Sequence, residues 1–173
     1  MGAGKTSVGR ALGQRLNWVF EDLDDRIQLR EHRSVAEIFR DPGESAFRRA
    51  EHDALRALLK ELSGDSPRII ALGGGAFVQD ENAALLQVSA LPSVFLDAPV
   101  DELWQRCCLQ AGSDHPIERP LLRDRERFRE LYETRRKRYA QASITIQTGG
   151  RQVEDIAAEI AETLGLRKLT VGR

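Results

Sequence analysis

The feature that most constrains the fold is a glycine-rich stretch at residues 2–6, Gly-Ala-Gly-Lys-Thr. It matches the end of the phosphate-binding pattern G-x-x-x-x-G-K-[ST], in which backbone N–H groups at the start of a helix surround a polyphosphate. In that pattern, Lys5 would reach the terminal phosphates and the hydroxyl of Thr6 would bind Mg²⁺. An ordinary loop before a helix is the competing interpretation of so short a string.

Two parts of the complete pattern are absent from the sequence: the first glycine and the buried strand that precedes it. We therefore interpret Met1 as an internal methionine taken for the start, or the chain as a fragment. A missing central strand would leave unpaired edges on its two neighbours, which is a liability for folding. We expect the chain as it stands to have reduced stability and activity.

The composition is that of a soluble globular protein and argues against two classes of partner. The 173 residues are 41% apolar and 31% charged, and 26 basic residues nearly balance 27 acidic ones. A net charge of −1 gives no general reason to expect nucleic acid or an anionic membrane as a partner. No apolar run reaches the length of a membrane span and no signal-peptide pattern is present, so we expect a cytoplasmic protein.

Helical and strand-like segments alternate along the chain, which predicts an α/β fold with a central parallel sheet covered by helices on both faces. Apolar runs predict strands at 18–22, 68–72, 93–96 and 144–147. Periodicity and capping residues predict helices at 8–16, 24–30, 34–39, 44–62, 80–88, 99–108 and 153–164. A long arginine-rich helix is also predicted after residue 122, ending at about residue 139. We expect one domain over 1–173, with a lid region at about 110–122 and a frayed tail over 166–173.

Two carboxylates follow the first predicted strand, at the end where open α/β sheets bind their ligands. Asp22 and Asp24 are two residues apart, so an extended chain places both side chains on one side. One could hold Mg²⁺ through water, and the other could orient or deprotonate an attacking hydroxyl. Alternatively, Asp24 only caps the following helix.

Three consecutive glycines, Gly73, Gly74 and Gly75, end the second predicted strand. Glycines cost backbone entropy and pack no side chain, so a run of them indicates a sharp bend or a close approach to the main chain. Exposed N–H groups at this point could bind a substrate oxygen. A plain tight turn is the alternative interpretation.

Several arginines could serve an anionic substrate. Arg48 lies early on a long predicted helix and Arg135 lies far away in sequence, and two such arginines at one cleft can clamp a carboxylate. Arg119 follows a polar segment and precedes a proline, as expected for a lid arginine that acts on a transferring phosphoryl group. Arg136, next to Arg135, shares the first possibility. For most arginines between residues 119 and 138, a solvated helix face is the better interpretation.

In these motifs the chain resembles the shikimate kinases, which transfer the γ-phosphoryl group of ATP to the 3-hydroxyl of shikimate on the route to chorismate and the aromatic amino acids. The motifs that carry the resemblance are GAGKT at 2–6, FEDLD at 20–24, SVAEIF at 34–39, GExxFR at 43–48, GGGA at 73–76, RPLL at 119–122, and Arg135 with Tyr139. They span nearly the whole chain in the family's order. The resemblance implies a three-layer P-loop kinase fold.

The resemblance also implies a complete set of site residues. For ATP it implies Gly2, Ala3, Gly4, Lys5, Thr6, Ser7, Arg106, Arg119 and Arg151. Arg119 would contact the phosphates, and Arg106 and Arg151 would lie around the adenine. For shikimate it implies Asp24, Arg48, Gly73, Gly74, Gly75 and Arg135. Lys5, Asp24 and Arg119 are the implied catalytic residues, with Asp24 as the base. Mg²⁺ would be the cofactor, held by Thr6 and through water by Asp22.

ATP and shikimate are therefore the expected partners, with no nucleic acid and no membrane, and a monomer is expected. The chain departs from the family in two further places. Residues 106–119 form a longer stretch than the usual lid region, and Arg136-Lys137-Arg138 replaces a proline-containing run, which would affect the backbone around Arg135. Two alternatives remain: a related kinase for another small molecule such as a sugar acid, and a non-catalytic ligand sensor.

Overall fold

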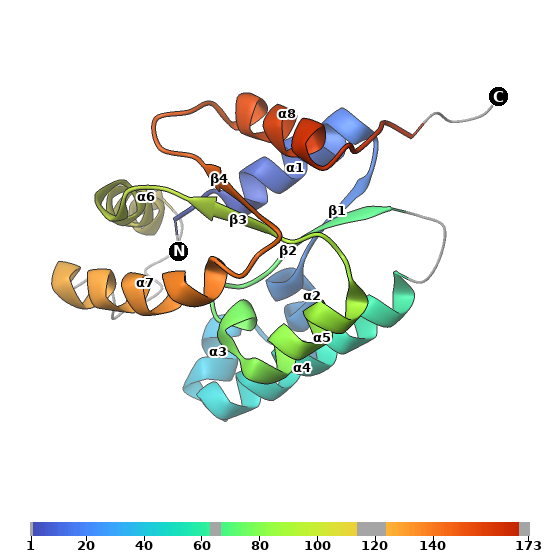
Figure 1. Ribbon diagram of the computed structural model, residues 1–173. Helices are drawn as coiled ribbons and strands as arrows, with labels where there is room; N and C mark the ends of the chain where they lie inside the picture. Colours follow the sequence, from blue (N-terminus) through green and yellow to red (C-terminus); the bar gives the residue numbers. More distant parts are fainter. Residues whose placement is uncertain (1, 63–66, 114–123, 170–173) are drawn as a thin grey trace.

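A computed structural model describes residues 2–62, 67–113 and 124–169, with eight α-helices, one short 3₁₀ helix and four strands among them (Figure 1). In chain order the elements are α1 (Lys5–Leu16), β1 (Val19–Asp22), α2 (Leu23–Glu31), α3 (Val35–Arg40), α4 (Glu44–Glu61), β2 (Arg68–Ala71), η1 (Ala76–Val78), α5 (Asp80–Ser89), β3 (Val94–Asp97), α6 (Val100–Ser113), α7 (Arg125–Tyr139), β4 (Ile144–Gln147) and α8 (Val153–Thr163). The predicted strands and helices are confirmed, with boundaries that move by a few residues.

The strands form two parallel pairs. β1 pairs with β2, with Val19 opposite Arg68, and β3 pairs with β4, with Val94 opposite Ile144. Parallel strands joined by helices confirm the predicted α/β class. Within the described residues no ladder joins β2 to β3, so each of these strands has one edge without a strand partner.

Helices cover both sides of the strands. In Figure 1, α1 and α8 lie together on one side and α2, α3, α4 and α5 on the other. The first side holds a buried cluster built from α1, β3, β4 and α8, and the second a cluster built from α2, α3, α4 and Ala76. A third cluster joins α6 to α7 through Leu103, Phe128 and Tyr132. These clusters fix the helices that carry the candidate site residues.

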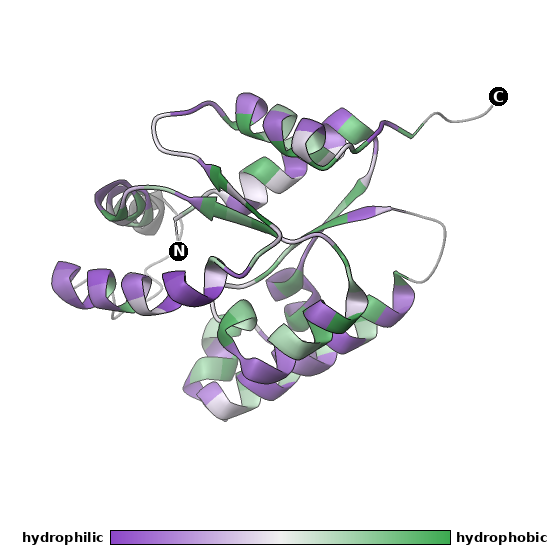
Figure 2. Cartoon of the chain, viewed as in Figure 1, coloured by the Kyte–Doolittle hydropathy of each residue, from purple (hydrophilic) through white to green (hydrophobic). Residues whose placement is uncertain are grey.

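Local sequence explains why these helices form where they do. Ser34 and Glu37 make a reciprocal capping box at the start of α3, with the Ser34 Oγ accepting from the Glu37 backbone N–H at 3.2 Å. In α4, Phe47, Leu55 and Leu58 recur at helical spacing and are almost fully buried. The outer faces of α4 and α7 are largely hydrophilic, whereas β3 and β4 are hydrophobic (Figure 2).

The chain beyond α8 contacts the end of α1. Leu166 is partly buried against the α1–α8 cluster, and the N–H of Leu169 donates to the carbonyl of Leu16 at 2.9 Å. The flexible tail expected over 166–173 stays a prediction. The last residues, 170–173, lie outside the described part. Most of the expected lid also lies outside it, and residues 110–113 are the end of α6.

No helix in the described ranges combines the length and the apolar character that crossing a membrane requires.

The unpaired edges of β2 and β3 generate a first prediction. Ala3 packs against both the α1–α8 cluster and the α6–α7 cluster, so the N-terminal residues lie close to both halves of the fold. An added N-terminal segment of about five β-branched residues, a common strand length, should pair with the two edges and stabilise the protein. We expect its thermal midpoint to rise by at least about 2–4 °C, the shift that corresponds to 1 kcal/mol at this size.

The control for this prediction is a glycine-serine extension of equal length, which adds chain without strand propensity. Thermal unfolding followed by circular dichroism compares the two proteins. Equal midpoints would show that the inner edges of β2 and β3 do not accept a strand.

Candidate active site

The predicted phosphate loop leads directly into α1. Gly4 has φ 79° and is the N-cap residue of α1, with no side chain accepting hydrogen bonds from the first turn. Gly2 also has positive φ, and a Cβ there would lie 2.6 Å from the carbonyl oxygen of Leu103, so only glycine fits. The N–H groups at the start of the helix therefore face outward without a side-chain partner, which suits an anion.

Thr6 and Asp22 meet beside this loop. The Thr6 hydroxyl donates to Oδ2 of Asp22 at 3.0 Å, and Oδ1 of Asp22 accepts from the backbone N–H of Asp24 at 3.1 Å. Asp22 is thus the N-cap of α2, and the alternative that Asp24 caps this helix is wrong. The side chain of Asp24 is therefore available for another role.

Asp24 carries a buried oxygen that accepts no hydrogen bond from any described residue. This atom, Oδ1, lies on the side of Gly73, because a Cβ added at Gly73 would be 2.9 Å from it. Burial is the main cause that raises the pKa of Asp24, and the charge of Asp22 adds to it, while Lys5 and Arg48 act in the opposite direction. A donor such as a substrate hydroxyl would satisfy this oxygen.

Glu51 is a site residue that the sequence analysis missed. It is fully buried, and its Oε2 accepts from Arg48 Nη1 at 2.8 Å and from Gln79 Nε2 at 2.6 Å. Its Oε1 lacks a partner in the described residues and lies 3.0 Å from the position of a Cβ on Gly73. Burial raises the pKa of Glu51, although the hydrogen bond from Arg48 opposes the shift. The sequence did contain a signal for this residue: Glu51 lies four residues after Phe47 and so falls on the apolar face of α4, where an acidic residue is unusual.

Arg48 is held in place before any substrate binds. Its Nη1 donates to Glu51, and its Nε and Nη2 donate to Glu44 Oε1 at 3.3 and 3.0 Å. The guanidinium lies so close to the backbone of Gly75 that a Cβ there would collide with it. The glycine run is therefore required for close packing of Arg48, and is more than the plain tight turn considered as an alternative.

Arg135 approaches the same loop from α7. It lies about one helical turn before Tyr139, whose hydroxyl donates to the carbonyl of Gly74. Burial is the largest cause that raises the pKa of Tyr139, and the charges of Arg135 and Arg48 oppose it. The two arginines predicted to clamp a carboxylate therefore both lie near Tyr139, which contacts the glycine loop.

The two arginines expected near the adenine lie at the end of β4. Arg106 on α6 donates to the carbonyl of Thr148 at 3.1 Å and pairs with Glu102. Arg151 donates to the carbonyl of Gln147 at 2.9 Å. Both arginines are thus brought together at one place, whereas Arg119 lies outside the described residues.

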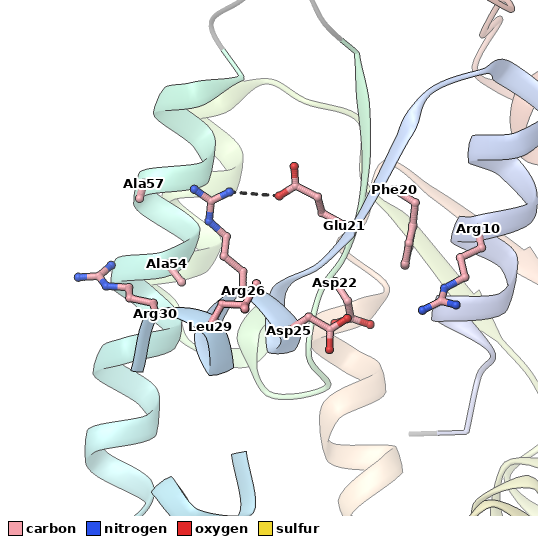
Figure 3. Close-up of a pocket in the computed structure, with 10 residues that line it drawn as sticks. All are labelled: Arg10, Phe20, Glu21, Asp22, Asp25, Arg26, Leu29, Arg30, Ala54 and Ala57. Atoms are coloured by element: carbon pink, nitrogen blue, oxygen red, sulfur yellow. Dashed lines mark hydrogen bonds and ion pairs between the residues drawn. The ribbon is translucent and has the colours of Figure 1, made fainter. Parts of the chain in front are cut away.

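A cavity of about 830 Å³ opens beside β1 and is not centred on the predicted site residues (Figure 3). Its lining residues are Arg10, Phe20, Glu21, Asp22, Asp25, Arg26, Leu29, Arg30, Ala54 and Ala57. Of the predicted site residues only Asp22 lines it. We therefore place the candidate site where Asp24, Arg48 and the glycine loop meet, on the chemistry of these residues. The position of the cavity does not point to the same place.

Comparison with known proteins identifies the family. The family model described as shikimate kinase matches residues 1–165. The chain belongs to the shikimate kinase family. A shikimate kinase from Cereibacter sphaeroides is 40% identical over 170 residues, which are 96% of this chain and 80% of that protein. One from Persephonella marina is 35% identical over 161 residues, 92% of each chain.

A solved structure supports the same conclusion. Shikimate kinase from Acinetobacter baumannii, determined in complex with shikimate, superimposes with a TM-score of 0.82 at 32% identity, covering 98% of this chain and 91% of that one. The predicted membership of the shikimate kinase family and the predicted fold class are confirmed. The roles of individual residues stay predictions.

The raised pKa of Asp24 predicts how the thermal stability of this shikimate kinase family member depends on pH. Its pKa is higher in the folded state than in an unfolded chain, so the ionised carboxylate opposes folding at neutral pH. We expect Asp24→Asn to raise the thermal midpoint at pH 7. The gain should vanish as the pH falls below about 4, the ordinary pKa of aspartate, because both states of the wild type are then neutral at this position.

Thermal melts between pH 3 and 8 test this, with Asp25→Asn as the matched control, since Asp25 is an exposed neighbour in the first turn of the same helix. Asp25→Asn should give no such gain, because it removes a favourable interaction with the helix N-terminus. A lower midpoint for Asp24→Asn than for the wild type at pH 7 would contradict the prediction.

Proposed function

We propose that the protein is a shikimate kinase that converts ATP and shikimate into ADP and shikimate 3-phosphate. The observation that carries the proposal is the convergence of Asp24, Arg48 and Arg135 around the glycine loop, beside a phosphate-binding helix start. This cluster offers an acceptor for a hydroxyl and two cations for a carboxylate. Shikimate carries both groups on one small ring, and a sugar-acid kinase would not need this pairing.

The phosphate loop supplies the nucleotide half of the proposed site. Backbone N–H groups over residues 2–7 bind phosphate oxygens, and Lys5 stabilises negative charge on the transferring group. Arg106 and Arg151, fixed to carbonyls at the end of β4, flank the adenine. Arg119 contacts the phosphates in this proposal, by its place in the family motif.

The residues present fit Mg²⁺ as the cofactor. The Thr6 hydroxyl and Asp22 Oδ2 are 3.0 Å apart, and both are hard oxygen ligands of the kind that Mg²⁺ prefers. Thr6 would bind the ion and Asp22 would hold one of its waters, with phosphate oxygens and further waters completing the set. When bound, the ion neutralises charge on the β- and γ-phosphates.

The acceptor half explains how the proton moves. Asp24 Oδ1, which lacks a hydrogen bond, accepts one from the 3-hydroxyl and orients its oxygen toward the γ-phosphorus. As the new O–P bond forms and the bond to the β–γ bridging oxygen breaks, the hydroxyl proton passes to Asp24. Its raised pKa makes the carboxylate a better base than an exposed aspartate. Arg48 and Arg135 hold the shikimate carboxylate with charge-assisted hydrogen bonds.

The first test is release of ADP with shikimate as the acceptor, compared with gluconate as a sugar acid. We expect turnover with shikimate only, and a loss of at least about 100-fold in kcat for Asp24→Asn, the lower range for removing a general base. ATP binding measured by calorimetry should persist in this variant, and Asp25→Asn should turn over normally. Normal kcat in Asp24→Asn would exclude the proposed role. Turnover with gluconate, or ligand binding without turnover, would favour the two alternatives.

The carboxylate clamp has its own test. We expect Arg135→Ala to weaken shikimate binding by about tenfold or more, because a charge-assisted hydrogen bond contributes about 1.5–3 kcal/mol. The methyl ester of shikimate lacks the charged group, so the wild type should bind it weakly and Arg135→Ala should lose little further affinity for it. Calorimetric titration of both ligands into both proteins completes the cycle. Equal losses for acid and ester would show that Arg135 does not contact the carboxylate.

A further inference from the structure

A buried carboxylate outside the proposed site lies at the end of β3. The Asp97 side chain is 5% exposed and accepts hydrogen bonds from three side chains on two elements, α7 and β4. Arg136 Nη2 donates to Oδ2 at 2.7 Å, the Tyr132 hydroxyl donates to Oδ1, and Gln147 Nε2 donates to Oδ2 at 3.4 Å. Burial raises the pKa of Asp97, but these hydrogen bonds outweigh it and keep the pKa below the usual value. The carboxylate is therefore held ionised.

Two of the three donors come from α7. Tyr132 and Arg136 are four residues apart, so they lie on the same face of the helix and point to the same strand end. α7 continues as a regular helix through Tyr139, and the expected disturbance of the backbone around Arg135 is absent in the described chain. The Arg136 guanidinium therefore pairs with a buried charge, although its side chain is 53% exposed.

The neighbouring residues on α7 face the proposed acceptor site. Arg135 directly precedes Arg136, and Tyr139 lies less than one turn further on and donates to the carbonyl of Gly74. The C-terminal half of α7 is thus attached at one point to β3, through Asp97, and at another to the glycine loop. Rotation or displacement of this half would move the Arg135 guanidinium away from Arg48.

The side chain and the backbone carbonyl of Asp97 bind different partners. Its carboxylate faces α7, whereas its backbone carbonyl accepts from the N–H and hydroxyl of Thr148 at 2.7 and 3.1 Å. The carbonyl of Thr148 in turn accepts from Arg106, on the proposed nucleotide side. The carboxylate also accepts from Gln147 on β4, so the change that acts on the acceptor side is removal of Arg136, which leaves the contacts of Gln147 and Thr148 with Asp97 in place.

We propose that Arg136 is a positioning residue: through its ion pair with Asp97 it fixes the end of α7, so that Arg135 and Tyr139 meet the acceptor and the glycine loop. The catalytic part of this inference rests on the proposed function. Removing Arg136 leaves a buried carboxylate without its cation, which is costly. It creates little cavity, because the Arg136 side chain is 53% exposed.

The kinetic test uses Arg136→Ala and Arg136→Lys, with Arg129→Ala as the matched control. Arg129 lies on the same helix and pairs with Asp101 at 3.2 Å, but both side chains are exposed. We expect Arg136→Ala to raise KM for shikimate about five- to tenfold, with kcat and KM for ATP changed less than about twofold, since about 1.4 kcal/mol corresponds to tenfold. Arg136→Lys should restore part of the loss, and Arg129→Ala should match the wild type. An unchanged KM for shikimate in Arg136→Ala would overturn the proposal.

Hydrogen exchange supplies a measurement that does not depend on turnover. Backbone amides in the last two turns of α7 and in the glycine loop should exchange faster in Arg136→Ala than in the wild type or Arg129→Ala. Equal exchange in all three proteins would show that the pair does not fix the helix. A wild type without shikimate-dependent turnover would contradict the proposed function alone, because the exchange experiment still decides whether Arg136 holds α7.

Discussion

The proposed site depends on how closely side chains approach the backbone of the glycine loop. Arg48 lies against Gly75, where a Cβ would collide with it, and the carboxylates of Asp24 and Glu51 lie 2.9 and 3.0 Å from the position of a Cβ on Gly73. Because the loop has no side chains of its own, a cation and two acids reach one small volume next to exposed main-chain N–H groups. Any larger residue at Gly73 or Gly75 would displace a charged group and separate the partners on which the site relies.

Two buried acids in one site oppose folding, and the structure offsets this only in part. Arg48 and Gln79 satisfy one oxygen of Glu51, while Oδ1 of Asp24 and Oε1 of Glu51 have no partner among the described residues. Unsatisfied buried acceptors cost free energy in the unliganded protein. A substrate that brings hydroxyl donors would recover this cost on binding, so the same atoms that weaken the fold favour the ligand.

Local patterns predicted the parts of this molecule that depend on local interactions. Periodicity located the helices and strands, and the motif at residues 2–6 located the phosphate loop. The tertiary roles were not readable in the same way. Glu51 looks like any helical glutamate until its burial is known, and Arg136 and Arg129 have similar sequence neighbourhoods but pair with a buried and an exposed carboxylate, respectively. Likewise, the hydrogen bond from the N–H of Leu169 to the carbonyl of Leu16 on α1 could not be predicted from the sequence of the tail.

The division of the strands gives the helices a larger part in assembling the site. β1 and β2 carry Asp22 and lead into Asp24 and the glycine loop, whereas β3 and β4 carry Asp97 and lead to Arg106 and Arg151. Since no ladder joins the pairs within the described residues, other contacts must hold them in register. α1 packs on both pairs through one apolar cluster, and α7 links Asp97 to Gly74 through two side chains. The distance between the proposed phosphate loop and the proposed acceptor site therefore depends on helix packing, and α7 is the connection that also carries Arg135, the arginine proposed to bind the substrate.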